Sequence, residues 1–263
     1  LLAALPPGAG RASEPQALRD AALVPGWVTQ EGGHMAALHL ALAPGWKTYW
    51  RAPGETGIPP QIAFSRSENL AEARLHWPAP EVIESVGQRS LGYSGALTLP
   101  IELSPARPGA PIALRADIEI GVCRDICMPV SLRLSADLPT APGSARGAHA
   151  GTLAAALANR PRTAAEAGIG AVSCVLAPIS DGARLDVRIA NPPQGTKAAA
   201  VELPDPLIWI SDATLGWEGA ALSASADLVP PPGQPLAFDR GALTITLIGP
   251  MGAVEISGCA GAG

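Results

Sequence analysis

Two of the chain's four cysteines lie in the stretch Gly121-Val122-Cys123-Arg124-Asp125-Ile126-Cys127-Met128-Pro129-Val130. On either side of the cysteines, apolar and polar residues alternate with a period of two, over 112–122 upstream and 128–138 downstream. This alternation is typical of half-buried strands, and the few residues between them are enough for a tight turn. The stretch therefore predicts a β-hairpin that carries a cysteine at the tip end of each strand.

The positions of the two cysteines in the alternating pattern predict which way their side chains face. Both are odd-numbered and fall in the polar set of their strand, so we expect both to face away from the core. Fully extended, four residues span roughly 13 Å, whereas a disulfide needs Cα atoms about 4.4–6.8 Å apart. A bond between Cys123 and Cys127 therefore requires the chain to turn back. On a loop-entropy model so short a loop contributes only ~2 kcal/mol, and the bond could open without unfolding its domain.

The spacing alone leaves other roles open for this pair. A tight structural disulfide is one. Half of a zinc site is less favoured, because structural zinc normally takes four ligands with paired C-x2-4-C spacings and no histidine lies close in sequence. A c-type haem would need C-x-x-C-H, which is absent. Arg124 would favour a thiolate nearby and Asp125 would oppose it.

Composition narrows the fold class and the partners. The 263 residues are 48% hydrophobic, enough for one large core or two of ordinary size. The 28 prolines and 29 glycines predict many turns and few long helices, and so an all-β sandwich fold. A net charge of −5 argues against nucleic acid or an anionic membrane as a partner. No stretch approaches 18 uninterrupted apolar residues, so we expect no transmembrane helix.

The chain divides into four segments by pattern. Residues 1–17 resemble the end of a signal peptide, an apolar run followed by small residues, which predicts export. Residues 18–140 alternate as strands of a first β-sandwich. Residues 141–168 are predicted to be a linker that contains a short helix over about 149–159. Strand patterns then resume in 169–263, which predicts a second sandwich.

The other two cysteines, Cys174 and Cys259, lie near the two ends of the second sandwich. Four cysteines allow three pairings, and the pairing within domains, Cys123 with Cys127 and Cys174 with Cys259, agrees best with this organisation. Export would place all four in an oxidising compartment. The loop of about 86 residues between Cys174 and Cys259 would contribute roughly 4–5 kcal/mol, which predicts a structural role for that bond.

Further motifs occur in the order found in a known family. They are Thr48-Tyr49-Trp50-Arg51-Ala52-Pro53-Gly54-Glu55-Thr56-Gly57, Trp77-Pro78-Ala79-Pro80, Gly92-Tyr93, Leu99-Pro100 and Val122-Cys123-x3-Cys127-Met128-Pro129. With them, residues 25–140 resemble the periplasmic amino-terminal (alpha) domain of the DsbD/ScsB (suppressor of copper sensitivity) thiol–disulfide reductases. The second half resembles the extra domain of the ScsB-like branch.

The resemblance implies two tandem immunoglobulin-like domains and no cofactor. It also implies a protein-disulfide reductase of the bacterial periplasm, which relays electrons from a transmembrane thiol reductase domain, on the same or a separate chain, to thioredoxin-fold proteins. Cys123 and Cys127 would be the reactive pair. Cys127 matches the position that forms the mixed disulfide with a partner, and Cys123 matches the one that resolves it.

The resemblance also implies residues around the pair. A cap loop that shields the cysteines matches about 83–90, with Glu84 at an acidic position, and Trp50 matches an aromatic position that flanks the site. Two features depart from DsbD itself: three residues separate the cysteines instead of five, and Val86 stands where DsbD has an aromatic cap residue.

Two other classes of function compete with this interpretation. In a non-catalytic tandem immunoglobulin-like binding module the pair would be inert. A periplasmic Cu(I)-binding protein is the other, since thiolates favour Cu(I) and Met128 lies beside Cys127, although the sequence predicts no metal site. A hydrolase is disfavoured, because no G-x-S-x-G motif is present.

Overall fold

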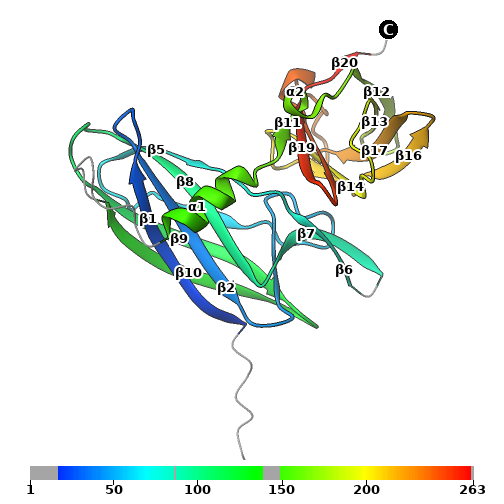
Figure 1. Ribbon diagram of the computed structural model, residues 1–263. Helices are drawn as coiled ribbons and strands as arrows, with labels where there is room; N and C mark the ends of the chain where they lie inside the picture. Colours follow the sequence, from blue (N-terminus) through cyan, green and yellow to red (C-terminus); the bar gives the residue numbers. More distant parts are fainter. Residues whose placement is uncertain (1–16, 86, 139–148, 262–263) are drawn as a thin grey trace, which may run out of the picture.

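The computed structural model describes residues 17–85, 87–138 and 149–261 (Figure 1). Over these residues the chain forms four β-sheets, two within 18–138 and two within 162–261. The predicted fold class, two tandem immunoglobulin-like β-sandwiches, is thus confirmed. The signal-peptide prediction for 1–17 falls almost entirely outside the described residues. No helix in the described part of the chain is long and apolar enough to cross a membrane.

The first domain packs a four-stranded sheet against a six-stranded one. The four-stranded sheet has the order β1-β2-β8-β5, with β1 (Leu18–Val28), β2 (His34–Leu42), β8 (Ala96–Pro105) and β5 (Leu70–Leu75). The other has the order β10-β9-β3-β7-β6, with β4 also on β9. Its strands are β10 (Cys127–Leu138), β9 (Ile112–Cys123), β3 (Lys47–Tyr49), β7 (Gln88–Ser94), β6 (Glu81–Ser85) and β4 (Gln61–Ala63).

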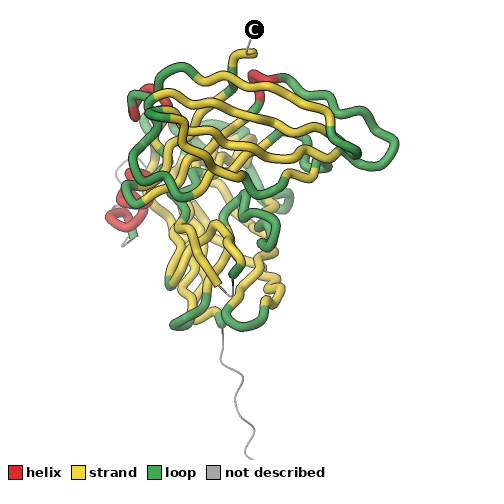
Figure 2. The backbone as a smooth tube through the Cα atoms, turned by 90° about the vertical axis from the view of Figure 1, so that its right-hand side faces the viewer, coloured by secondary structure: helices red, strands yellow, loops and turns green. Residues whose placement is uncertain are grey.

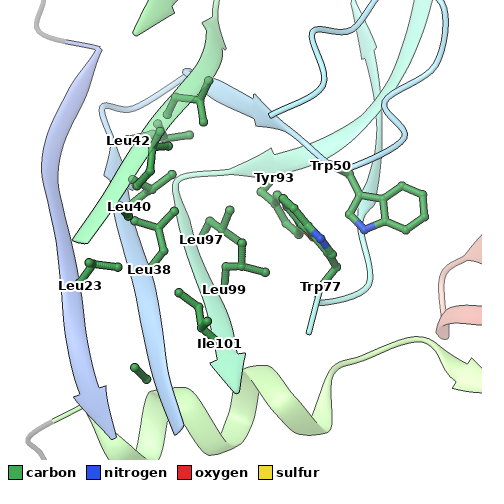
Figure 3. Close-up of a cluster of buried hydrophobic side chains, with 14 of the residues drawn as sticks. Leu23, Leu38, Leu40, Leu42, Trp50, Trp77, Tyr93, Leu97, Leu99 and Ile101 are labelled. Atoms are coloured by element: carbon green, nitrogen blue, oxygen red, sulfur yellow. The ribbon is translucent and has the colours of Figure 1, made fainter. Parts of the chain in front are cut away.

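The core of the first domain lies between these sheets (Figure 3). In β2 and β8, alternate leucines such as Leu38 and Leu99 point inward and are almost completely buried. The predicted helix is confirmed as α1 (Ala150–Ala158). Its Leu153 is fully buried among Val24 and Met35 of the first domain, so α1 is docked on this domain.

The second domain repeats the arrangement with shorter strands. One sheet has the order β11-β19-β18-β14, with β11 (Arg162–Thr163), β19 (Gly252–Ser257), β18 (Thr244–Gly249) and β14 (Ala198–Glu202). The other has the order β15-β17-β13-β12-β20, with β16 also on β17. Its strands are β15 (Trp209–Ile210), β17 (Ala221–Val229), β13 (Ala183–Ala190), β12 (Val172–Pro178), β20 (Ala260–Gly261) and β16 (Thr214–Glu218).

Two short helices, α2 (Ala164–Ala167) and η1 (Arg240–Ala242), complete the second domain. β11 and α2 fall within the segment 141–168 that the sequence predicts to be a linker. β11 pairs with β19, so this part of the segment contributes to the second domain's sheet. The boundaries of the two domains otherwise stay a prediction.

The two domains lie against each other (Figures 1 and 2). Four apolar residues of the second domain belong to the same buried cluster as Trp50 of the first: Ala198, Ala200, Ile248 and Ala253. β6 of the first domain also contacts β18 of the second. The second domain is therefore packed on the first near the β6–β7 hairpin.

Candidate functional site

The hairpin predicted from the alternating pattern is formed by β9 and β10. The two strands pair in an unbroken antiparallel register from Ile112 opposite Leu138 to Cys123 opposite Cys127. Residues 124–126 make the turn between them. The register places the two cysteines side by side, and a disulfide joins them with their Cα atoms 4.1 Å apart.

The two cysteines differ in exposure. Cys127 is exposed at the start of β10, but Cys123 is only 1% exposed, so a position away from the core does not leave Cys123 open to solvent. The reason is that β3 pairs with this end of β9, with Lys47 opposite Cys123, and the side chain of Tyr49 on β3 reaches the sulfur of Cys123. The outer face of β9 is therefore covered here, although alternation correctly places Cys123 on that face.

Tyr49 covers Cys123. Its hydroxyl lies 3.0 Å from Sγ of Cys123 and 3.2 Å from Sγ of Cys127. Because disulfide sulfurs carry no hydrogen, the hydroxyl is the donor in both contacts. Burial raises the pKa of Tyr49 above its ordinary value, so the hydroxyl keeps its proton at neutral pH. The side chain is thus a hydrogen-bond donor placed on the reactive atoms.

Two glycines make room for the ring of Tyr49. A Cβ atom on Gly121 would lie 3.0 Å from Cδ2 and Cε2 of the ring, and one on Gly57 would lie 3.1 Å from Cδ1. Both distances are tighter than ordinary van der Waals contact, so a larger residue at either position would push on the ring. The ring is therefore held between the backbone of β9 and the loop that contains Gly57.

Charged side chains also surround the pair. Arg124, in the turn, stacks over the ring of Trp46 at 5.5 Å and donates to Asp125 at 2.8 Å. Lys47 donates to the neutral hydroxyl of Ser90 at 3.1 Å, and burial lowers its pKa. Arg124 and Asp125 largely cancel each other, whereas the charge of Lys47 is not neutralised by its partner. On balance these groups favour a thiolate at this end of β9.

The structure places Trp50 in the core of the first domain. Its side chain is fully buried near Trp77 and Tyr93 (Figure 3). The aromatic side chain at the disulfide is instead that of the preceding residue, Tyr49. Sequence reasoning missed Tyr49, although a signal was present: with the period of a strand, Tyr49 shares a face with Lys47, and Trp50 belongs to the opposite one.

The predicted cap segment forms the β6–β7 hairpin. In the sheet, β7 and β3 separate β6 from β9, so Glu84 on β6 lies away from the cysteines. Glu84 lines a polar cleft together with Glu55 and Arg89 of the first domain and Asp212 of the second. Val86 lies outside the described residues. The roles assigned to Glu84 and Val86 by resemblance stay predictions.

The second disulfide joins Cys174 on β12 to Cys259, which follows β19, with Cα atoms 5.8 Å apart. The two disulfides thus have the pairing expected from the sequence. Cys174 is part of the buried core of the second domain, and Cys259 packs against that core. Among the described residues, no group of three or more histidine, cysteine and acidic side chains could hold a metal ion.

Comparisons with known proteins agree with the fold. Residues 14–139 match the family model described as the N-terminal part of thiol:disulfide interchange protein DsbD. The crystal structure of the N-terminal periplasmic domain of ScsB from Proteus mirabilis is similar in fold, with 23% sequence identity, a TM-score of 0.66 and 92% of each chain covered. No curated protein matches the chain. The likeness in fold extends over both domains.

Proposed function

Because residues 14–139 belong to the family of DsbD amino-terminal domains, we propose that this chain relays electrons in the periplasm. It would accept them from a transmembrane thiol reductase domain and pass them to thioredoxin-fold proteins. The observation that carries the proposal is the asymmetry of the pair: exposed Cys127 is bonded to buried Cys123 at the tip of a hairpin. Such a pair can meet a partner through one sulfur and complete the reaction with the other.

The reaction needs only the two cysteines and a partner disulfide. The thiolate of Cys127 attacks one partner sulfur, so that a mixed disulfide forms and the partner's second sulfur leaves as a thiolate. Cys123 then loses its proton and attacks the sulfur of Cys127, which releases the partner's first sulfur. Two electrons have passed to the partner, whose thiolates take up protons. The membrane reductase would restore the dithiol by the same exchange in reverse.

The surroundings of the pair suit this division of roles. Cys127 is the sulfur that a partner can approach, and Cys123 stays within bonding distance of it through the paired ends of β9 and β10. The hydroxyl of Tyr49 reaches both sulfurs, so it can donate to whichever one carries the charge. Lys47 adds a positive charge opposite Cys123.

Trapping tests the proposal. With Cys123 replaced by serine, the mixed disulfide on Cys127 can no longer be resolved, so we expect a stable adduct with oxidised thioredoxin-fold proteins. Adducts are detected by non-reducing electrophoresis and identified by mass spectrometry. The matched control is Cys127→Ser, which keeps the buried thiol and should trap little. Absence of any adduct with Cys123→Ser, or equal trapping by both variants, would refute the proposal.

The hydroxyl of Tyr49 gives a second prediction. Tyr49→Phe keeps the ring between the two glycines and removes only the donor. A hydrogen bond to a charged group contributes about 1.5–3 kcal/mol, and one pH unit corresponds to about 1.4 kcal/mol. We therefore expect the midpoint of the pH profile for alkylation of Cys127 to rise by about one to two pH units, because the thiolate loses a donor. A midpoint that stays in place or falls would show that the hydroxyl does not stabilise the thiolate.

A further inference from the structure

The loop of residues 51–58, called the clamp loop below, is tied to the second domain by Arg51. The guanidinium of Arg51 donates to both carboxylate oxygens of Glu202, at 2.8 and 3.0 Å, and to Glu255 at 2.6 Å. Glu202 lies on β14 and Glu255 on β19. All three side chains are at least partly buried, with Arg51 25% and Glu202 22% exposed. Charge-assisted, two-point contacts of this kind fix orientation as well as distance.

A second tie lies four residues further along the clamp loop. The backbone N–H of Glu55 donates to Oδ1 of Asp212 at 3.1 Å, and the backbone N–H of Asp212 donates to Oε1 of Glu55 at 2.9 Å. Gly54, with φ at +89°, permits this approach, because a Cβ atom there would lie 2.5 Å from Oδ1 of Asp212. The clamp loop is therefore held to the second domain at both of these points.

The other side of the clamp loop lies on the site. A Cβ atom on Gly57 would lie 3.1 Å from Cδ1 of Tyr49, so the clamp loop passes close beside the ring, and Cβ of Ile58 lies 3.0 Å from where a Cβ atom of Gly121 would be. The carbonyl of Pro53 accepts a hydrogen bond from Leu91 of β7 at 2.9 Å. The clamp loop is thus a layer between the second domain and the side chain that touches both sulfurs.

We propose that the second domain positions Tyr49 on the cysteine pair by holding the clamp loop through Glu202, Glu255 and Asp212. The inference rests on the proposed function of the pair and gives the second domain a part in it. These three residues touch neither sulfur and are positioning residues. Released from the second domain, the clamp loop would no longer confine the ring of Tyr49 on the side of Gly57, and the ring could leave the sulfurs.

Neutralising Glu202 and Glu255 would shift the formation of the Cys127 thiolate in opposite directions through its charge effect and through the loss of the clamp. The proposal can therefore be tested by the direction of the shift. The charged groups that face the pair are Lys47 on β3 and Arg124 with Asp125 in the turn. Neutralising Glu202 and Glu255 removes two negative charges from the molecule, which by itself makes a nearby thiolate easier to form. If the clamp loop positions Tyr49, the same change makes the thiolate harder to form, because its hydrogen-bond donor is lost.

The experiment compares four reduced proteins: the wild type, the double variant Glu202→Gln with Glu255→Gln, the variant Tyr49→Phe, and the variant that combines all three changes. The pH profile of iodoacetamide alkylation is measured at Cys127 by mass spectrometry. We expect the midpoint of the double variant to rise in the direction seen for Tyr49→Phe, by up to about two pH units. In the Tyr49→Phe background, the two glutamine substitutions should add nothing to the rise.

A matched control is present in the same domain. Arg188 donates to Glu218 at 2.9 Å, and neither side chain has a hydrogen bond to the clamp loop or to Asp212 among the described residues, so Glu218→Gln should leave the midpoint unchanged. Additive shifts with Tyr49→Phe, or a midpoint that is unchanged or falls in the double variant, would overturn the proposal. Where the double variant does not fold, Asp212→Ala takes its place. The alkylation midpoint is again expected to rise, and additive shifts or a midpoint that does not rise would again overturn the proposal.

This experiment is independent of partner trapping. Iodoacetamide needs no protein partner, so a chain that traps no thioredoxin-fold protein can still show the coupling. Conversely, normal trapping by Cys123→Ser with no coupling would leave the proposed function standing and remove only the role of the second domain.

Discussion

Replacing both Cys174 and Cys259 with alanine is expected to lower the free energy of unfolding of the second domain by about 4–5 kcal/mol. The bond joins residues 85 apart in sequence, and it links the first long strand of the domain to the segment after its last long one. It therefore removes a large share of the conformations open to the unfolded chain. Domains are stable by only about 5–15 kcal/mol, so this loss is a large part of the total.

The first disulfide provides the control for this experiment. Cys123 and Cys127 are four residues apart, and replacing both with alanine should cost only ~2 kcal/mol. Urea unfolding followed by hydrogen exchange, resolved by peptide, reports each domain separately. Equal losses of stability from the two replacements would contradict the division into one bond that can cycle and one that holds its domain together.

The sequence carried enough information for the hairpin and its register. The alternation over 112–122 and 128–138 has one core face on each strand, and a slip of one residue would turn every apolar side chain outward. Registers that differ by two residues keep both faces consistent, and the short turn at 124–126 selects the one that places Cys123 opposite Cys127. Local pattern was sufficient because the two strands are adjacent in sequence.

What covers the hairpin could not be predicted from that pattern. Alternation tells which face a residue lies on, but burial on that face depends on the segments that pack over it. Cys123 is covered because Tyr49, 74 residues earlier, reaches it, and Arg51 meets Glu202 across 151 residues. Contacts between residues so far apart in sequence do not alter the local hydrophobic pattern of either segment. The roles of Tyr49 and the clamp loop can therefore be seen only in the structure.

The uneven exposure of the pair leads to the second large effect. In the reduced protein we expect iodoacetamide to alkylate Cys127 on the order of 100-fold faster than Cys123. Cys123 is 1% exposed, so a reagent can reach it only after Tyr49 and the clamp loop open. A local opening that costs about 3 kcal/mol leaves roughly one molecule in a hundred accessible at a time.

Mass spectrometry of the two modified peptides at short reaction times measures this ratio directly. The same protein in denaturant is the control, because both cysteines are then equally accessible and the ratio should fall to near one. Tyr49→Ala tests the cause: it removes the cover and should speed the reaction of Cys123 much more than that of Cys127. Equal rates in the folded wild type would mean that a partner can attack either sulfur, and the assignment of Cys127 as the sulfur that meets the partner would then fail.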